Sequence, residues 1–278
     1  MKSYSVFSVL AIAALVLVLT GCPPRTEETA KTTFLLSASG DAVKADVPLD
    51  DIEALFVTVT KDSVIAGEGD GIPDVNAGDP EDPDPKDEVV VFEGAMDVNL
   101  LDLTDVAQVL SAYDLEADTY NQIRLSISDP EMHLFSMPGV AITDIQLTAN
   151  GRLFVTEKFT VTDEPRLILL TFEDVKIVIQ GNGGYTWTPQ VQADVSTVSA
   201  EVVADGVITA VDSASGNITV DVAGSEVPVA YGAALVYLPT DTGTATGDVS
   251  ALVVGASVHV EGTLFVDGSI QADAIHIL

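Results

Sequence analysis

Apolar and polar residues alternate with a period of two along most of the chain, which is the pattern of half-buried β-strands. In the segments 55–60, 123–128 and 175–180, Leu, Ile or Val occupies every second position. The segment 166–172 is apolar on both faces and is predicted to be a central strand. The glycine-rich residues 182–184 then predict a turn that joins segments 174–180 and 185–195 into a hairpin.

One segment of this first region has a helical period instead. Thr104 is suited to cap a helix, and one helical face would carry Val106, Val109, Leu110 and Tyr113. Many strands with one short helix predict an all-β unit, an antiparallel β-sandwich, over residues 34–198.

Residues 201–278 form a second series of short strands. We expect strands at 206–212, 218–222, 226–231, 234–238, 256–266 and 269–277. Asp267-Gly268 separates the last two and is a strong hairpin signal. Six short strands in so few residues predict a small closed, OB-like β-barrel, because closure removes exposed strand edges.

The N-terminus has the features of a bacterial lipoprotein signal. An apolar run from Val6 to Leu19 is too short for a comfortable membrane span and suits a signal-peptide core. It ends in Leu19-Thr20-Gly21-Cys22, which resembles a lipobox. We therefore expect residues 1–21 to be removed, lipid to be attached at Cys22, and residues 22–33 to form a tether. The alternative is an ordinary signal peptide with an incidental cysteine.

The expected address is the cell envelope, in the outer membrane or at the cell surface. Pro23-Pro24 follow Cys22, and an Asp there would resemble an inner-membrane retention signal. The expected partner is thus the membrane, contacted through the lipid anchor.

The strongly negative net charge of the chain argues against nucleic acid as a further partner. The chain has 43 acidic and 11 basic residues, a net charge of −32, so nucleic acid is not an expected partner. From residue 177 to the C-terminus there is no Lys or Arg, which excludes an arginine clamp for a phosphate or carboxylate ligand in that part.

The segment 67–88 concentrates acidic residues. It holds nine acids and four prolines in 22 residues, and such a long connection in a compact domain indicates function or disorder. Hard oxygen ligands of the kind that calcium prefers follow one another at short steps: Glu68, Asp70, Asp74, Asn76 and Asp79. The segment 70–74 resembles a calcium-binding repeat of thrombospondin type 3, but only one copy is present. Calcium is therefore the one expected cofactor. The alternative is a solvated insertion of mutually repelling charges.

Three stretches of the first region together resemble a known family. They are Leu100–Leu103, Leu115–Leu125 and Gly181–Tyr185, and their order and spacing are similar to those of the family catalogued as domain of unknown function 4382. The resemblance covers about residues 34–198 and implies a lipid-anchored bacterial surface protein with a sandwich fold. It implies no activity. The chain departs from the family at Gly40–Val43, where an Asp-Ala-Pro step is usual.

The C-terminal region has a shorter resemblance. Gly206–Asp212, Leu252–Gly262 and Ala272–Ile275 are similar to a small bacterial domain of unknown function numbered 5666.

Candidate ligand-binding residues are few. Tyr185 and Trp187 share one face of a strand beside the glycine-rich turn and would suit a platform for sugars, although both could instead pack in the core. His259 and His276 could meet across neighbouring strands and bind a metal with Glu261, while ordinary exposed strand positions are the alternative. His133 is expected in a loop.

No catalytic residue is predicted. A Gly-x-Ser-x-Gly elbow is absent from the sequence, and the number of carboxylates carries no information in so acidic a chain. We therefore expect a non-enzymatic binding, adhesion or scaffold protein of the envelope that contacts a glycan or an envelope protein. The alternatives are a surface hydrolase that acts on glycans through carboxylates and a purely structural subunit of an envelope complex.

Overall fold

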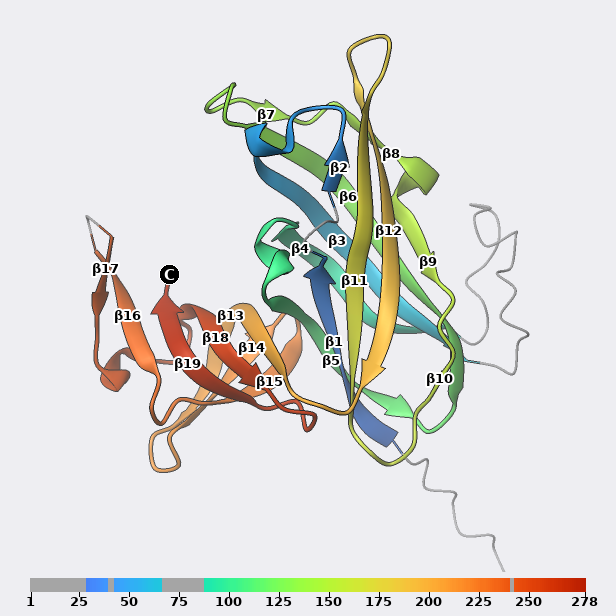
Figure 1. Cartoon of the computed structure of the whole chain (residues 1–278). Coiled ribbons are helices and arrows are strands. Elements are labelled where there is room, and N and C mark those ends of the chain that lie inside the picture. The colour runs from blue at the N-terminus through green and yellow to red at the C-terminus, as the bar shows by residue number, and fades with distance from the viewer. Residues whose placement is uncertain (1–28, 40–42, 67–87, 241–242) are drawn as a thin grey trace, which may run out of the picture.

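The computed structural model describes residues 29–39, 43–66, 88–240 and 243–278. These residues form nineteen strands and four short 3-10 helices, so the all-β prediction is confirmed. The 3-10 helices are η1 (Leu49–Asp51), η2 (Asp102–Thr104), η3 (Thr148–Gly151) and η4 (Val249–Ala251). Figure 1 shows an upright sandwich with a smaller barrel beside its lower half.

Two sheets make the sandwich. One contains β1 (Thr29–Ala38), β2 (Val43–Ala45), β5 (Ala107–Glu116), β8 (Ile145–Leu147), β11 (Arg166–Ile179) and β12 (Tyr185–Ser196), in the order β5-β1-β11-β12-β8 with β2 beside β11. The other contains β3 (Ile52–Ala66), β4 (Glu88–Asn99), β6 (Thr119–Leu134), β7 (Ala141–Ile142), β9 (Arg152–Val155) and β10 (Phe159–Thr160).

The first sheet is mixed rather than antiparallel throughout. β11 and β12 form the expected hairpin, but β1 and β2 run parallel to β11, and β8 runs parallel to β12. A tight turn forces antiparallel pairing only between strands that follow one another. β1 and β11 are separated by the whole second sheet, so no turn fixes their relative direction.

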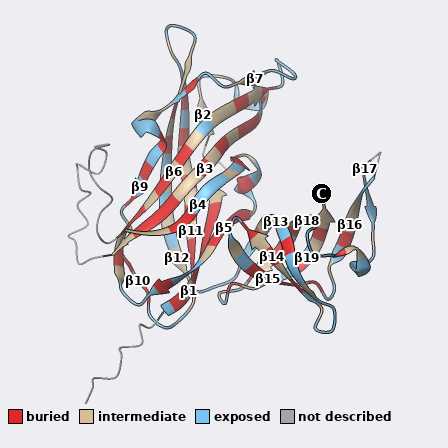
Figure 2. Cartoon of the chain, turned by 180° about the vertical axis from the view of Figure 1, so that it is seen from behind, coloured by how far each residue is buried: buried red, intermediate tan, exposed pale blue. Residues whose placement is uncertain are grey.

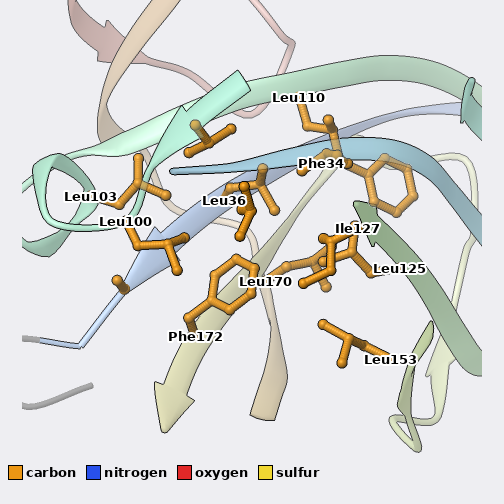
Figure 3. Close-up of a cluster of buried hydrophobic side chains, with 14 of the residues drawn as sticks. Phe34, Leu36, Leu100, Leu103, Leu110, Leu125, Ile127, Leu153, Leu170 and Phe172 are labelled. Carbon is orange, nitrogen blue, oxygen red and sulfur yellow. The ribbon is translucent and has the colours of Figure 1, made fainter. Parts of the chain in front are cut away.

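Side chains from both sheets fill the sandwich core. Figure 3 shows this packing, with Leu125, Ile127 and Leu153 from the second sheet facing the first. Their partners include Phe34 and Leu36 of β1 and Leu170 and Phe172 of β11, all of them fully buried. The period-two pattern of the sequence therefore marks the faces that meet in this core.

Residues 200–278 form the second unit, which has the OB-like order. Its strands are β13 (Ala200–Asp212), β14 (Asn217–Val222), β15 (Ser225–Ala230), β16 (Leu235–Thr240), β17 (Gly243–Thr246), β18 (Ser257–Leu264) and β19 (Ile270–Ile277). Pairing runs β13-β14-β15-β19-β18 and returns to β13, which closes a five-stranded barrel. β16 and β17 extend from the edge of β19.

Two glycines allow the barrel strands to approach one another closely. A Cβ atom at Gly206 would lie 2.3 Å from the carbonyl oxygen of Asp221, and one at Gly262 would lie 2.2 Å from that of Gln271. Since any other side chain would push these strands apart, closure depends on glycine at both positions.

The predicted helix near residue 104 is wrong. Residues 107–116 are strand β5, preceded by the single turn η2. Leu110 packs into the sandwich core while Val109 packs into the barrel core, so both faces of the strand are apolar. Burial on two sides produced a spacing that resembles a helical face, and Tyr113, which would complete that face, is exposed.

The same double burial extends across β1 and β11. Leu35 and Leu167 belong to the barrel core, whereas their neighbours Phe34 and Ile168 belong to the sandwich core. β5 also pairs directly with β13, and the backbone N–H of Ala112 donates to Ser225 Oγ at 3.1 Å. Sandwich and barrel are thus joined by one continuous sheet and a shared apolar cluster. Figure 2 shows buried residues on these strands where the two units meet.

β1 begins earlier than the sequence indicated. The predicted tether ends at residue 33, but Thr29–Thr33 lie in β1, and Thr32 and Thr33 are buried. Pairing with β5 and β11 satisfies the backbone of these residues, so polar side chains do not prevent them from joining the sheet.

The shared cluster leads to a prediction about cooperativity. Leu35→Ala should lower the free energy of unfolding by about 2–5 kcal/mol, as large-to-small changes in cores do. Because Leu35 lies in the sandwich and packs in the barrel, Trp187 fluorescence and amide exchange of the barrel strands should both report the loss. Leu235→Ala, at an exposed position of β16, is the control. Unchanged exchange in the barrel of the Leu35 variant would contradict this coupling.

Candidate functional site

Four side chains form a row across the outer surface of the barrel. Backbone pairing places Asp205 of β13 opposite His259 of β18, His259 opposite His276 of β19, and His276 opposite Tyr237 of β16. We call these four residues the histidine row. On β18, the residues before and after His259 are Val258 and Val260, and both are buried in the barrel core. Because successive side chains of a strand point to opposite faces, His259 and the rest of the row lie on the outer face.

Asp205 orients the first histidine. The Nδ1–H of His259 donates to Asp205 Oδ1 at 2.7 Å. This hydrogen bond, together with the negative charges of Asp205 and Glu261, raises the pKa of His259, while partial burial opposes the rise. When the ring is neutral, a proton held on Nδ1 leaves the lone pair on Nε2 free to accept a proton or bind a cation.

Glu261 lies two residues along β18 and faces both imidazoles. Its Oε1 atom is 3.7 Å from His259 Nε2 and 3.4 Å from His276 Nε2. The ring of Tyr237 stacks on that of His276, with centroids 4.5 Å apart and planes 15° apart. The structure therefore brings together the three residues that the sequence suggested, and stacking limits the freedom of the second histidine.

Sequence reasoning missed two members of the row. Asp205 and Tyr237 lie on strands far from each other in the chain, and only the barrel register places them beside the histidines. His133 lies apart from the row, in β6, where its Nε2 contacts Glu131 Oε1 and its ring meets Phe56 edge-on. Within the described ranges, no three or more His, Cys, Asp and Glu side chains are already arranged to hold a metal ion.

The structure does not support the sugar-binding platform expected at Tyr185 and Trp187, because Trp187 is buried. Trp187 has no exposed surface and lies in the sandwich core, against which the half-buried Tyr185 packs. A ring without exposed surface cannot stack on a sugar at the protein surface. The core alternative therefore describes these two residues.

Several predicted residues lie outside the described residues. They are the lipidation site Cys22 and the calcium ligands Glu68, Asp70, Asp74, Asn76 and Asp79. Ala66, which precedes the acidic segment, and Glu88, its last residue, are described. Ala66 pairs with Tyr120 near the start of β6, at the end of the sandwich where β1 also begins. Lipidation and calcium binding stay predictions.

An exposed apolar loop lies at the end of the sandwich opposite the start of β1, and it was not predicted from the sequence. Residues 135–140 follow β6 and are all exposed, and they include Phe135, Met137 and Val140, which are 62%, 41% and 47% exposed. We call this loop the apolar tip. A sequence signal existed, since three large apolar residues alternate there with Ser, Pro and Gly, which favour turns rather than a strand.

The apolar tip is fixed by hydrogen bonds to η1. Asp51 accepts from the backbone N–H and the hydroxyl of Ser136, at 2.7 and 2.6 Å, and its carbonyl accepts from the N–H of Phe135 at 2.8 Å. The N–H of Met137 donates to Leu134 and that of Val140 to Met137. The loop backbone that carries the exposed side chains is thus held in one conformation.

Comparison with known families gives one match. A family model described as Domain of unknown function (DUF4382) matches residues 43–189, more than half of the chain. The chain belongs to this family. Neither the curated proteins nor the solved structures gave a match. Within the described ranges the helices are single turns, and none is long and apolar enough to cross a membrane.

The DUF4382 match covers the apolar tip but not the histidine row. The apolar tip and Trp187 lie inside residues 43–189, whereas all four residues of the histidine row lie beyond them. The row is therefore a feature of the C-terminal barrel, whose resemblance to domain of unknown function 5666 stays a prediction.

Inside the DUF4382 match, Asp62 is a buried acid. It lies in β3 with no exposed surface, and neither of its carboxyl oxygens makes a hydrogen bond of normal geometry. Burial raises the pKa of Asp62 well above its usual value, and the nearby backbone N–H of Ser63 opposes this only in part. A protonated carboxyl is much less costly to bury than a charged one.

This burial predicts a pH-dependent effect of Asp62→Asn. As pH rises above about 4, the unfolded chain releases the Asp62 proton before the folded chain does, so wild-type stability falls until the raised pKa is passed. Asn stays neutral, so the variant should gain melting temperature over wild type at pH 7 and little at pH 4. Asp163→Asn, at an exposed position, is the control. An advantage for Asp62→Asn that is equal at both pH values would contradict the assignment.

Calcium binding by the acidic segment has its own test. Millimolar calcium should raise the melting temperature of the wild type by mass action and leave that of Asp70→Ala/Asp74→Ala unchanged. Asp84→Ala/Asp87→Ala, in the remainder of the segment, should respond as the wild type does. The absence of any calcium effect on the wild type would remove the predicted site.

Proposed function

We propose that this chain is a lipid-anchored cell-envelope protein that binds a partner protein through the apolar tip and catalyses no reaction. The observation that carries the proposal is a fixed, exposed cluster of Phe135, Met137 and Val140 on an otherwise strongly acidic molecule. Exposed apolar residues scattered singly are ordinary, but three in one ordered loop indicate a contact surface.

The position of the tip suits a protein that reaches outward from a membrane. β6 runs from the end where β1 begins to the tip, and its sixteen residues span roughly 50 Å. Only six residues lie between Cys22 and Thr29, so an anchor at Cys22 would hold that end within about 25 Å of the bilayer. The apolar tip would then face away from the membrane, because β7, which follows it, lies at the end of the sandwich opposite the start of β1 (Figure 1).

Charge around the tip specifies the partner. The flanking segments 49–53 and 131–144 carry Asp50, Asp51, Glu53, Glu131 and Asp144 and contain no Lys or Arg. An anionic lipid surface would be repelled by these carboxylates, and so would a second copy of this chain. The chemistry instead fits a protein with an apolar pocket bordered by Lys or Arg, since complementary charge steers association and aligns the surfaces.

The shared core supports a scaffold role. A tip can transmit position or force only if the body behind it is rigid, and here the central sheet is buried on both faces. A loop whose backbone is already held by hydrogen bonds loses little conformational entropy when it binds a partner. This small entropy loss favours high affinity.

Site-specific photo-crosslinking in the native host tests the proposal. A photoreactive phenylalanine analogue at position 135 should yield a discrete crosslinked species, and the same analogue at Phe265, exposed on the barrel, should not. The crosslink should weaken with Met137→Ser and with added salt, because both apolar and charged contacts contribute. Equal crosslinking from positions 135 and 265 would exclude the tip as the contact.

The anchor is tested in the same cells. Cys22→Ser should release the protein from the membrane fraction and reduce the crosslink at position 135, because the tip would no longer be held at the envelope. Retention of Cys22→Ser in the membrane fraction would show that the lipid is not what attaches the chain. Since Phe135 and Met137 are exposed, their variants should keep the wild-type melting temperature, which separates lost binding from lost folding.

A further inference from the structure

We infer that the outer face of the barrel carries a binding site for a divalent transition-metal ion of the zinc class, formed by His259, His276 and Glu261 and oriented by Asp205. The site lies outside the family match and is separate from the apolar tip. It therefore goes beyond the proposed partner-binding function.

The spacing of the three donors supports this assignment. Glu261 Oε1 lies 3.4 and 3.7 Å from the Nε2 atoms of His276 and His259. These separations are long for hydrogen bonds. They are close to the distance between two ligands of a tetrahedral zinc ion, which is about 3.3 Å for bonds of about 2.0–2.1 Å. Two imidazoles and one carboxylate are also a common ligand set for such ions.

The Asp205–His259 pair adds an independent feature. Histidines that bind metals usually donate their other ring N–H to a carboxylate, which fixes the tautomer and turns the free nitrogen toward the ion. Here the Nδ1–H of His259 donates to Asp205 Oδ1 at 2.7 Å, so Nε2 is the free nitrogen on the side of Glu261. Asp205 is thus a positioning residue rather than a ligand.

Surface exposure leaves Glu261 free to rotate toward the two histidines, whose rings are oriented by Asp205 and Tyr237. Glu261 is about half exposed, and the two histidine side chains are 29% and 28% exposed. In their present positions the three donors do not yet surround one point, and small side-chain rotations are required. Exposed side chains make such rotations within nanoseconds. The ion would keep one position open to solvent, because the row lies on the outside of the barrel.

Electrostatics favours a cation here. Residues 177–278 contain no Lys or Arg that could compete for Asp205 or Glu261. Hard ions such as calcium prefer six to eight oxygens, so the two imidazole nitrogens select a softer ion. The site is therefore chemically distinct from the calcium ligands predicted in the acidic segment.

Zinc titration of the full-length protein tests the inference. Isothermal calorimetry with zinc chloride should show a site of micromolar or tighter affinity in the wild type, and His259→Ala/His276→Ala should lose it by at least a hundredfold. Asp205→Asn should weaken binding by about 10–100-fold, as loss of such an orienting carboxylate does. His133→Ala, which removes the histidine outside the row, should bind as the wild type does. Millimolar calcium should not compete.

A second measurement keeps the test independent of folding. In nitrogen-15 histidine spectra, zinc should shift the Nε2 resonances of His259 and His276 and leave those of His133 in place. Asp205→Asn should change the tautomer of His259 before zinc is added, which a purely structural role for Asp205 would not do. If zinc binds elsewhere on this acidic chain, the wild type and the double histidine variant should bind it with equal affinity. Equal affinity of wild type and double variant, or no shift of either resonance, would overturn the inference.

Discussion

The rest of the structure depends on a sheet that is buried on both faces. β5, β1 and β11 separate two apolar cores, with Phe34, Leu110 and Ile168 on the sandwich side and Leu35, Val109 and Leu167 on the barrel side. Each buried side chain of this size contributes roughly 1.5–3 kcal/mol, so removing either layer would expose a continuous apolar surface. The two units are therefore expected to behave as one body, although each has its own core.

Double burial also explains where reasoning from the sequence succeeded and failed. The run 166–172 is apolar on both faces and was correctly predicted as a central strand. β5 has the same character, and burial of both its faces gives its apolar residues a spacing that resembles a helical face. Alternation of apolar and polar residues identifies a strand only when one of its two faces is polar. Once a second layer covers the strand, the pattern no longer distinguishes strand from helix.

The proposed binding surfaces are positioned by the two cores, but the cores do not require them. The apolar tip depends on Asp51 of η1, and the histidine row depends on the register of four barrel strands. The exposed side chains of the apolar tip add little to stability. Asp62 is the converse case, a fully buried acid whose pKa is raised by burial.

By itself, the sequence determined the all-β class, the β11–β12 hairpin, the barrel strands and the acidic character of the surface. These follow from local properties: alternation, turn residues and charge are written along the chain. It also suggested that His259 and His276 would meet. Tertiary structure alone decided that Trp187 is buried, that β1 runs parallel to β11, and that Asp205 and Tyr237 join the histidines. These depend on strand pairings across long sequence separations, where a shift of one residue turns a side chain to the opposite face.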